Sequence, residues 1–340
     1  MSRMKVCVYV EYEDTLKKYG DTGIRNSAIM ARKALESAGV QVTCDLGEDY
    51  DILDLNPVAF IKAQSVLKVA RKHGRKVAVH VHTTPENFRN SFWFADAIAP
   101  FVDRQMLKLY RSADGLVCVS NYVKDTLECM GVPGKKHVVG NCFESPDMAR
   151  GNRDRYRKKY RLEGIVPFSV GLVIPRKGIE TFVNVAGKMP NRFIWYGALS
   201  SGIATSFRGK KIARNAPNNV TFAGYVDNIN DAYASGDIFF FPSMNETFGI
   251  VILEAMSAGK PVLVRDLPAY DWLRDGADCL KAKTDEEFAE KLGMLADDEA
   301  LRSRLAAAGK AKAGEYSLGK VGAKLREAYE HILNESGRKQ

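Results

Sequence analysis

Short valine-rich segments alternate with amphipathic helical patterns along this chain, and this alternation limits the possible folds more than any other feature. In the first 140 residues, helical patterns over 24–39, 57–74 and 121–131 separate most of the predicted strands. These strands are KVCVYV (5–10), VQVTC (40–44), DILDL (51–55), KVAVHVH (76–82), GLVCVS (115–120) and KHVVG (136–140). Nearly continuous apolar strands between helices are typical of a parallel sheet covered on both faces.

A second series of the same kind follows a charged stretch, ESPDMARGNRDRYRKKYRLEG (144–164), which contains few aliphatic residues. Its predicted strands are PFSVGLVIP (167–175), RFIWYG (192–197), NNVTFAGYV (218–226), DIFFFPS (237–243) and KPVLVRD (260–266). We therefore predict an α/β protein of two doubly wound, Rossmann-like domains. Because such sheets bind ligands beyond the carboxyl ends of their strands, we expect the site in the cleft between the domains.

The domain boundaries follow from the break in the strand pattern. We predict a first domain over 1–145, a linker over 146–164 and a second domain over 165–317. The last helical pattern, LGKVGAKLREAYEHILN (318–334), is expected to pack back onto the first domain.

The net charge is +9 and is unevenly distributed. Residues 1–160 carry 26 lysines and arginines against 19 acidic residues, and residues 161–340 carry 24 against 22. A basic first half suits an anionic partner, such as nucleic acid, an anionic membrane or a phosphorylated substrate, and equally suits a solvated lysine-rich surface. No nucleic-acid-binding motif accompanies the charge.

The expected cellular compartment is inferred from membrane-spanning, signal-peptide and paired-cysteine patterns, none of which is found in the sequence. No apolar run approaches the roughly 20 residues that span a bilayer, and MSRMKVCVYVEY is interpreted as a first strand rather than a signal peptide. The six cysteines form no CxxC pair, so we expect reduced thiols in a cytoplasmic protein and no zinc site.

The stretch FFFPSMNETFGIVILEAMSAGKPVLVRD (239–266) places two glutamates beside very apolar sequence. A buried strand, a loop and a helix ending at Gly259 put Thr247, Phe248, Gly249 and Ile250 at a helix N-terminus, where free N–H groups attract anions. Glu246 precedes this site and Glu254 lies one to two turns along the helix. Because a carboxylate next to a phosphate site repels phosphates, Glu246 needs another partner. Sugar hydroxyls, which donate hydrogen bonds, would fit.

The pattern PSxxExFGxxxxEAMxxGxPV resembles the donor-binding signature of retaining, nucleotide-sugar glycosyltransferases of family 4, which have the two-domain GT-B fold. The resemblance implies that Glu254 binds the ribose hydroxyls of the nucleotide and that Glu246 lies against the donor sugar. It also implies that the loop amides contact the sugar and the diphosphate.

Further segments extend the resemblance, with one departure. SVGLVIPRKGIETFVNVA aligns Lys177 with the family's lysine on the donor diphosphate, but Leu172 stands where the family has an arginine, and Arg176 is its expected substitute. FAGYV (222–226) implies that Tyr225 and Val226 lie near the base. YGDTGIRNS (19–27) fits the family's glycine loop, in which Gly23 lets the backbone approach the diphosphate.

The implied chemistry is glycosyl transfer with retention, through an oxocarbenium-like transition state. Lys177, Arg176 and the amides of 247–250 would stabilise the departing diphosphate, so we expect no metal and no cofactor beyond the nucleotide-sugar substrate. Asp49 and Asp51 form the sole DxD, in a context that argues against metal binding. His82 ends a strand and matches the family's His-Thr, so we expect it, with Thr83 as a weaker candidate, to orient the donor sugar or the acceptor hydroxyl.

A narrower resemblance concerns HTTPENFRNSFW (82–93), PRKGIETF, FIWYG and RDLPAYDWL (265–273), which are similar to bacterial glucosyltransferases that make monoglucosyl-diacylglycerol. It implies UDP-glucose as donor, a lipid acceptor such as diacylglycerol, and peripheral binding at the inner face of the cell membrane. Residues 57–76 are basic and apolar, and Phe92, Trp93, Phe94 and Phe101 add aromatics. This composition suits a membrane surface, and equally suits amphipathic helices whose aromatics pack on the sheet.

Two other functions remain open. A glycosyltransferase of the same fold could act on a soluble sugar or polysaccharide, and a nucleotide-sugar-binding module could lack catalysis altogether. The intact Glu246, Glu254 and Lys177 argue against the second. The oligomeric state is not predicted.

Overall fold

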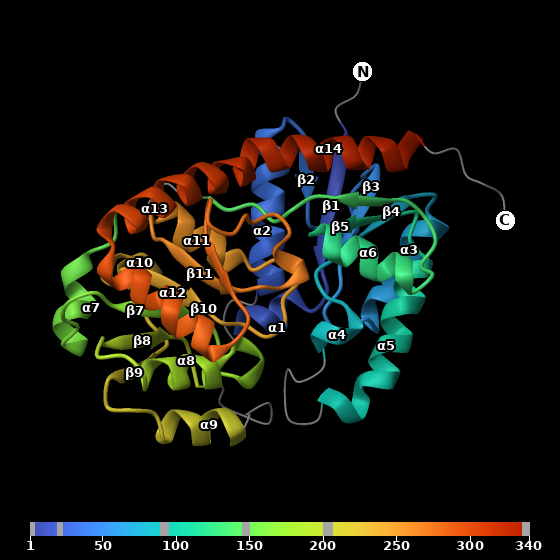
Figure 1. The fold of residues 1–340 in the computed structure, drawn as a ribbon. Helices are drawn as coiled ribbons and strands as arrows, with labels where there is room; N and C mark the ends of the chain where they lie inside the picture. Colours follow the sequence, from blue (N-terminus) through green and yellow to red (C-terminus); the bar gives the residue numbers. More distant parts are fainter. Residues whose placement is uncertain (1–3, 19–22, 89–94, 145–149, 200–206, 335–340) are drawn as a thin grey trace. The chain divides into compact units, whose positions relative to one another are not determined.

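A computed structural model describes residues 4–18, 23–88, 95–144, 150–199 and 207–334. The chain divides into two compact units, each built around its own six-stranded sheet (Figure 1). Unit 1 comprises Met1–Phe88, Ala97–Glu144 and Glu315–Gln340, and unit 2 comprises Arg89–Asp96 and Ser145–Gly314. Every strand pair in both sheets is parallel, so the predicted α/β fold class is confirmed.

The sheet of unit 1 has the strand order β2-β1-β3-β4-β5-β6. Its strands are β1 (Lys5–Val10), β2 (Gln41–Thr43), β3 (Ile52–Asn56), β4 (Lys76–Val81), β5 (Gly115–Cys118) and β6 (Lys136–Val138). The helices of this part of the chain are α1 (Glu13–Lys18), α2 (Gly23–Ser37), α3 (Lys62–Lys72), α4 (Pro85–Phe88), α5 (Ala95–Arg111), α6 (Asn121–Cys129) and α14 (Leu318–Asn334).

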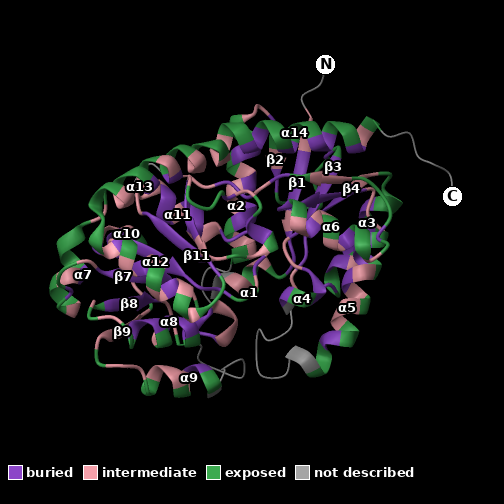
Figure 2. Ribbon diagram, in the orientation of Figure 1, coloured by how far each residue is buried: buried purple, intermediate pink, exposed green. Residues whose placement is uncertain are grey.

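Helix α14 belongs to the core of unit 1, although it lies at the far end of the sequence. Its buried Val321, Leu325, Tyr329 and Ile332 join one cluster with side chains of β1 and α2. The two helices approach closely, because a Cβ atom placed on Gly322 would lie 1.9 Å from the carbonyl oxygen of Ala34. Figure 2 shows the buried face of α14 turned toward this core and its outer face exposed.

Helix α3 begins five residues later than the sequence pattern predicts. The buried carboxylate of Glu11 accepts hydrogen bonds from the backbone N–H groups of Val58, Ala59 and Phe60, at 2.7, 2.7 and 2.8 Å, and from that of Ala63 at 3.0 Å. Phe60 has φ +65°. These N–H groups therefore bind a side chain, and the regular helix starts only at Lys62.

The sheet of unit 2 has the strand order β12-β11-β10-β7-β8-β9. Its strands are β7 (Pro167–Val170), β8 (Phe193–Tyr196), β9 (Val220–Gly224), β10 (Ile238–Phe241), β11 (Val262–Arg265) and β12 (Leu280–Ala282). The helices are α7 (Arg153–Tyr160), α8 (Ile179–Ala186), α9 (Phe207–Arg214), α10 (Ile229–Ser235), α11 (Ile250–Ser257), α12 (Asp285–Asp297) and α13 (Glu299–Ala313), with 3₁₀ turns η2 (Pro175–Lys177), η3 (Pro268–Tyr270) and η4 (Gly314–Tyr316).

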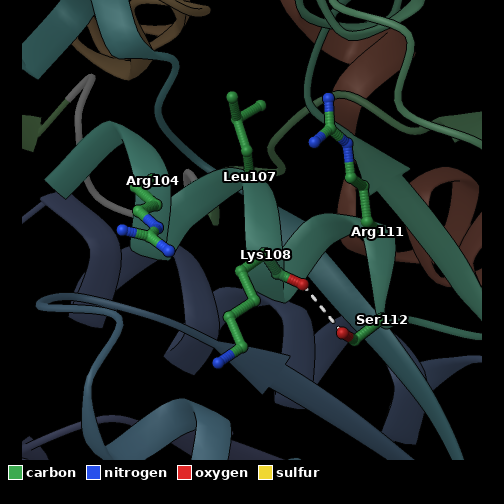
Figure 3. A pocket seen from close by; sticks show the side chains of 5 residues that line it. All are labelled: Arg104, Leu107, Lys108, Arg111 and Ser112. Carbon is green, nitrogen blue, oxygen red and sulfur yellow. Dashed lines mark hydrogen bonds between the residues drawn. The ribbon is translucent and has the colours of Figure 1, made fainter. Parts of the chain in front are cut away.

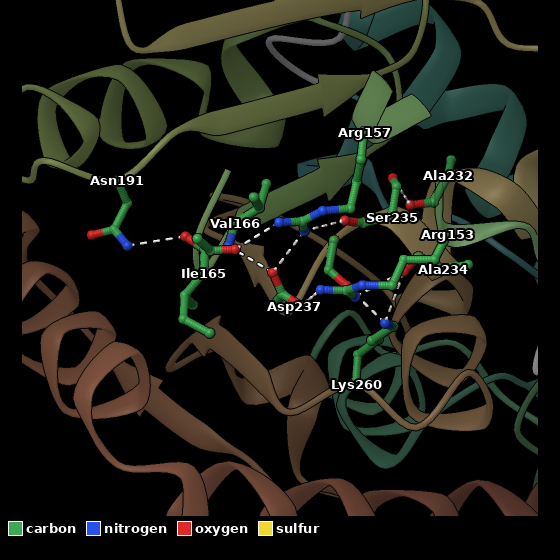
Figure 4. A network of polar contacts seen from close by, with 12 residues as sticks. Arg153, Arg157, Ile165, Val166, Asn191, Ala232, Ala234, Ser235, Asp237 and Lys260 are labelled. Atoms are coloured by element: carbon green, nitrogen blue, oxygen red, sulfur yellow. Dashed lines mark hydrogen bonds and ion pairs between the residues drawn. The ribbon is translucent and has the colours of Figure 1, made fainter. Parts of the chain in front are cut away.

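Helix α7 lies in the stretch that the sequence analysis treats as a linker, and ion pairs attach it to unit 2 (Figure 4). The carboxylate of Asp237 accepts hydrogen bonds from Arg153 at 2.5 Å, from Arg157 at 3.1 Å and from the N–H of Val166 at 2.9 Å. Lys260 donates to the carbonyl oxygen of Gly236 at 2.7 Å. Asp237 thus fixes α7 to the starts of β7 and β10.

Candidate active site

The loop between β10 and α11 carries most of the predicted site residues. Gly249 caps α11 in a left-handed conformation, φ +85°, which favours glycine. A Cβ atom here would lie 2.9 Å from the side chain of Ile252 and 3.1 Å from that of Tyr270, so a larger residue would shift the loop. Thr247, Phe248 and Ile250 surround this glycine, at the helix N-terminus that the sequence predicts.

Glu246 is the centre of a buried charged cluster. Its Oε1 lies 2.5 Å from Nζ of Lys177 and 4.0 Å from Nη1 of Arg176, and it accepts a hydrogen bond from the hydroxyl of Ser243 at 2.9 Å. Arg176 also donates to the carbonyl oxygen of Asn245 at 3.0 Å. The structure therefore brings three predicted residues from distant parts of the sequence into one group.

Burial and the neighbouring charges together shift the pKa values of Glu246 and Lys177 downward, which favours the charged form of Glu246 and the neutral form of Lys177. Burial alone would raise the pKa of Glu246, but the charges of Lys177 and Arg176 outweigh burial and leave that pKa below its usual value. Burial lowers the pKa of Lys177, and the carboxylate of Glu246 opposes this effect. The lowered pKa of Glu246 favours its carboxylate form, which lies against the amino group of Lys177 three residues before the N-cap of α11.

Glu254 lies on α11 in a different environment. Its carboxylate accepts a hydrogen bond from the hydroxyl of Tyr233 at 2.5 Å. Burial raises the pKa of Glu254, and the bond from Tyr233 reduces this rise. Unlike Glu246, it has no cation among the causes of its shift. A carboxylate of this kind can accept hydrogen bonds from neutral hydroxyl donors.

The position of the family arginine is occupied by an exposed apolar side chain, since Leu172 is 51% exposed just after β7. Arg176 lies at the buried cluster instead, and its Nε is buried without a hydrogen-bond partner. Tyr225 and Val226 follow β9, where Tyr225 is 81% exposed. Within the described residues, neither Tyr225 nor Val226 forms a hydrogen bond or ion pair with the Glu246 cluster.

Unit 1 carries the remaining predicted residues. Gly23 begins α2, and a Cβ atom added there would meet no described atom within 4 Å, while residues 19–22 of its loop lie outside the described part of the chain. His82 follows β4, and its Nε2 lies 2.7 Å from Oδ1 of Asn56. The carbonyl oxygen of Thr83 accepts a hydrogen bond from Tyr110 at 2.9 Å. These residues lie in a different unit from Glu246, Lys177 and Glu254.

Comparison with known proteins decides the family. Residues 45–144 match the model of Glycosyltransferase Family 4, and residues 165–298 match that of Glycosyl transferases group 1. A processive diacylglycerol alpha-glucosyltransferase of Acholeplasma laidlawii is 34% identical over 339 residues, covering 97% of this chain and 99% of that protein. This chain belongs to glycosyltransferase family 4. It is an enzyme of the hexosyltransferase class.

One further relative is similar to this family 4 glycosyltransferase in sequence, and two solved structures are similar to it in fold. An alpha-galactosylglucosyldiacylglycerol synthase of Streptococcus pneumoniae is 29% identical over 246 residues, covering 69% of this chain and 65% of that protein. HepE of Anabaena, solved with UDP and glucose, superposes with a TM-score of 0.75 at 17% identity, covering 97% of this chain and 100% of that one. A sucrose-phosphate synthase of Thermosynechococcus elongatus gives 0.79 at 16% identity, covering 98% and 100%. The fold is GT-B.

The acidic pair Asp49 and Asp51 of this family 4 glycosyltransferase has structural partners. Asp49 pairs with Arg75, and Asp51 accepts a hydrogen bond from the N–H of Lys5 at 2.7 Å. Within the described ranges, His, Cys, Asp and Glu side chains form no group of three or more that could hold a metal ion.

Four residues that contact the predicted site were not anticipated from the sequence. Ser243 contacts Glu246, Tyr233 contacts Glu254, and Asn56 contacts His82. The ring of Trp272 stacks on that of Phe248 at 5.0 Å and 12°. Ser243 and Trp272 stand inside the quoted motifs and could have been found there, whereas Tyr233 and Asn56 carry no local signal, since only tertiary packing brings them to their partners.

Proposed function

We propose that this glycosyltransferase moves glucose from UDP-glucose onto a lipid acceptor such as diacylglycerol, with retention of the anomeric configuration and without a divalent metal. The observation that supports the acceptor is likeness, over 97% of the chain, to a diacylglycerol glucosyltransferase. The proposed donor is the nucleotide sugar with which HepE of Anabaena, a protein of the same fold, was solved in a second complex, that with UDP-glucose. The proposed place of action is the cytoplasmic face of the membrane.

The Glu246 cluster suits the departure of a diphosphate. Negative charge grows on the leaving group as the anomeric bond breaks, and preorganised cations and helix N–H groups stabilise such charge. Lys177 and Arg176 lie beside the N-terminus of α11 and can act together with its N–H groups. At Lys177 the carboxylate of Glu246 opposes the loss of positive charge that burial and the neighbouring Arg176 favour. Its oxygens can also accept a hydrogen bond from a sugar hydroxyl.

The acceptor's proton needs a destination in a retaining transfer. In the proposed front-face route, a phosphate oxygen of the donor takes the proton from the attacking hydroxyl. His82 then orients a hydroxyl and is not required as a general base. Burial, followed by the neighbouring His80, holds the pKa of His82 well below its usual value, which favours a neutral imidazole for this role.

A cationic and apolar face on unit 1 supports membrane binding. The exposed residues of α5 recur at helical spacing, with Ile98 and Phe101 toward its start and Arg104, Lys108 and Arg111 toward its end. Figure 3 shows these three basic side chains, which line a pocket together with Leu107 and Ser112. Phe101 is 56% exposed, so it does not pack on the sheet; Phe92, Trp93 and Phe94 lie outside the described residues.

Helix α3 lies beside α5 and also exposes apolar side chains. Gln64 of α3 donates a hydrogen bond to the carbonyl oxygen of Gln105 in α5 at 3.1 Å, so the two helices are neighbours. Val69 of α3 and Ile61, its N-cap, are each 56% exposed, whereas Val66 is buried. Exposed apolar side chains among lysines and arginines suit the interface of an anionic membrane. No described helix is long and apolar enough to cross one.

The decisive experiment is transfer of radiolabel from UDP-glucose to diacylglycerol in mixed micelles, with EDTA present. We expect labelled glucosyl-lipid from the wild type. Lys177→Ala should lower the rate at least about tenfold, because the leaving group loses a preorganised cation.

Lys188→Ala is the matched control, since Lys188 pairs with the exposed Glu286 on the surface of the same unit. Its rate should equal that of the wild type. Absence of labelled lipid, despite UDP binding by calorimetry, would contradict the lipid acceptor and favour a soluble sugar. Loss of transfer in EDTA that Mg²⁺ restores would contradict metal independence.

A further inference from the structure

Two backbone segments of unit 2, 176–178 and 242–246, carry the buried charged cluster. The N–H of Met244 in the second segment donates a hydrogen bond to the carbonyl oxygen of Arg176 in the first at 2.8 Å. In return, Nη1 of Arg176 donates to the carbonyl oxygen of Asn245 at 3.0 Å. The contact between the lysine and the glutamate of the cluster therefore depends on how these two segments are held together.

Pro242 begins the second segment and is approached there from two sides. A Cβ atom placed on Gly178 would lie 2.1 Å from the carbonyl oxygen of Pro242, so the two backbones touch at this end. The same oxygen accepts a hydrogen bond from Nε of Arg265 at 3.2 Å. Arg265 ends β11 and begins the stretch RDLPAYDWL, to which the sequence resemblance gives no role. Its guanidinium thus reaches the point where the two segments meet.

The guanidinium of Arg265 binds three separate parts of unit 2. Besides the bond to Pro242, Nη2 donates to the hydroxyl of Thr181 in α8 at 2.9 Å, and Nη1 donates to the carbonyl oxygen of Lys283 at 2.7 Å. Its Cζ lies 5.2 Å from the centre of the Phe288 ring. A planar fork of donors can serve several fixed acceptors at once. Because α8 continues the first segment, the bonds to Thr181 and Pro242 join the first segment to the second.

We propose that Arg265 is a positioning residue, which holds segments 176–178 and 242–246 at the spacing that keeps Lys177 against Glu246. The part that Lys177 takes in the reaction rests on the proposed function, whereas its position rests on the contacts of unit 2 alone. Without the guanidinium, the bonds between the two segments lose the support of Thr181 and Pro242. A displacement of about 1 Å in a reacting group can lower a rate about 100-fold.

The first test follows the hydrogen bond between the segments in the full-length enzyme without substrate. Amide hydrogen exchange, resolved by NMR, reports on the N–H of Met244, which is bonded to Arg176. We expect Arg265→Ala to speed this exchange at least about fivefold, because bonds from a charged group no longer oppose local opening. Arg265→Lys should behave similarly, since an ammonium group cannot reproduce the planar fork. Unchanged exchange in both variants would overturn the proposal.

Arg302→Ala is the matched control within the same unit. Arg302 also donates two hydrogen bonds to carbonyl oxygens, those of Leu295 at 2.7 Å and Ala296 at 2.8 Å, and neither belongs to the two segments. In this variant, the exchange of the Met244 amide and the transfer rate should both equal those of the wild type. An equal acceleration in Arg302→Ala would mean that any lost arginine loosens unit 2, and would overturn the assignment to Arg265.

Thr181→Val decides the question if Arg265→Ala does not fold. This substitution keeps the shape of the side chain and removes only the oxygen that accepts from Nη2 of Arg265. It should speed the exchange of the Met244 amide in the same direction, by a smaller factor. Exchange at the wild-type rate in a folded Thr181→Val enzyme would then count against the proposal.

Kinetics show whether Arg265 acts through Lys177. Arg265→Ala should lower kcat for glucosyl transfer at least about tenfold in the wild-type background, but less than about threefold when it is combined with Lys177→Ala. A purely structural Arg265 would lower kcat by the same factor in both backgrounds, and that result would overturn the positioning role. If the exchange of Met244 changes as expected but the wild type labels no lipid, the proposed function fails and the assignment of Arg265 to the spacing of the segments stands.

Discussion

At the scale of single residues, two glutamates eight positions apart acquire opposite properties. Glu246 lies among cations and its pKa falls despite burial, whereas the pKa of Glu254 rises because burial is opposed only by the Tyr233 hydroxyl. The sequence motif contains both residues but not these environments. The difference arises because Lys177 and Arg176 lie on η2, beside one glutamate and not the other.

The raised pKa of Glu254 predicts a pH dependence of nucleotide binding. If its carboxylate accepts ribose hydroxyls, protonation removes the charge, so UDP affinity should fall as the pH drops through that raised pKa. Tyr233→Phe removes the hydrogen bond that lowers this pKa, and the fall should therefore begin at a higher pH. Calorimetry between pH 5 and 8 measures how UDP affinity depends on pH for the wild type and for Tyr233→Phe. Titration of UDP itself affects both curves equally.

The matched control is Tyr329→Phe, which removes a buried tyrosine hydroxyl in the core of unit 1, whereas Glu254 belongs to unit 2. Its curve should coincide with that of the wild type. Superimposable curves for wild type and Tyr233→Phe would rule out Glu254 as the titrating group in nucleotide binding.

At the scale of helices and strands, the sequence predicts an element well where hydrophobic periodicity alone determines it. The prediction is poorer where a side chain from a distant part of the sequence binds the backbone of the element. The predicted helix 318–334 coincides with α14, and the predicted strands of both sheets form. Helix α3 starts late because Glu11, about fifty residues earlier, takes its first N–H groups. The strand β12 was not predicted, since its three residues are too short to show alternation. Local patterns thus determine elements, and tertiary contacts adjust their ends.

The contact of α14 with α2 gives a prediction for stability. Gly322→Ala places a Cβ atom against the carbonyl oxygen of Ala34, so the helices must separate, which should destabilise unit 1 by about 1–3 kcal/mol. Gly319→Ala in the same helix meets open space and should be neutral or stabilise by up to about 1 kcal/mol. Thermal unfolding of both variants provides the measurement. Equal melting temperatures would contradict close packing at Gly322.

At the scale of the whole molecule, the basic surplus is shared by the units. Dividing the chain by its compact units gives unit 1 24 lysines and arginines against 20 acidic residues, and unit 2 26 against 21. The excess in residues 1–160 arises largely from the basic helix α7, which belongs to unit 2. Net charge therefore does not single out unit 1 as the membrane-binding part. The membrane-binding part has to be identified from the spatial arrangement of charge, which only the structure provides.

We therefore expect local charge on α5, and not total charge, to control membrane binding. Replacing Arg104, Lys108 and Arg111 together by Ala should weaken binding to phosphatidylglycerol vesicles by up to about 100-fold, at about 1 kcal/mol per cation. Replacing Lys210, Lys211 and Arg214 of α9 removes the same charge from unit 2 and should leave binding nearly unchanged. Vesicle sedimentation in low salt measures both. Equal losses in the two triple variants would mean that net charge governs binding and would remove the α5 face from the proposal.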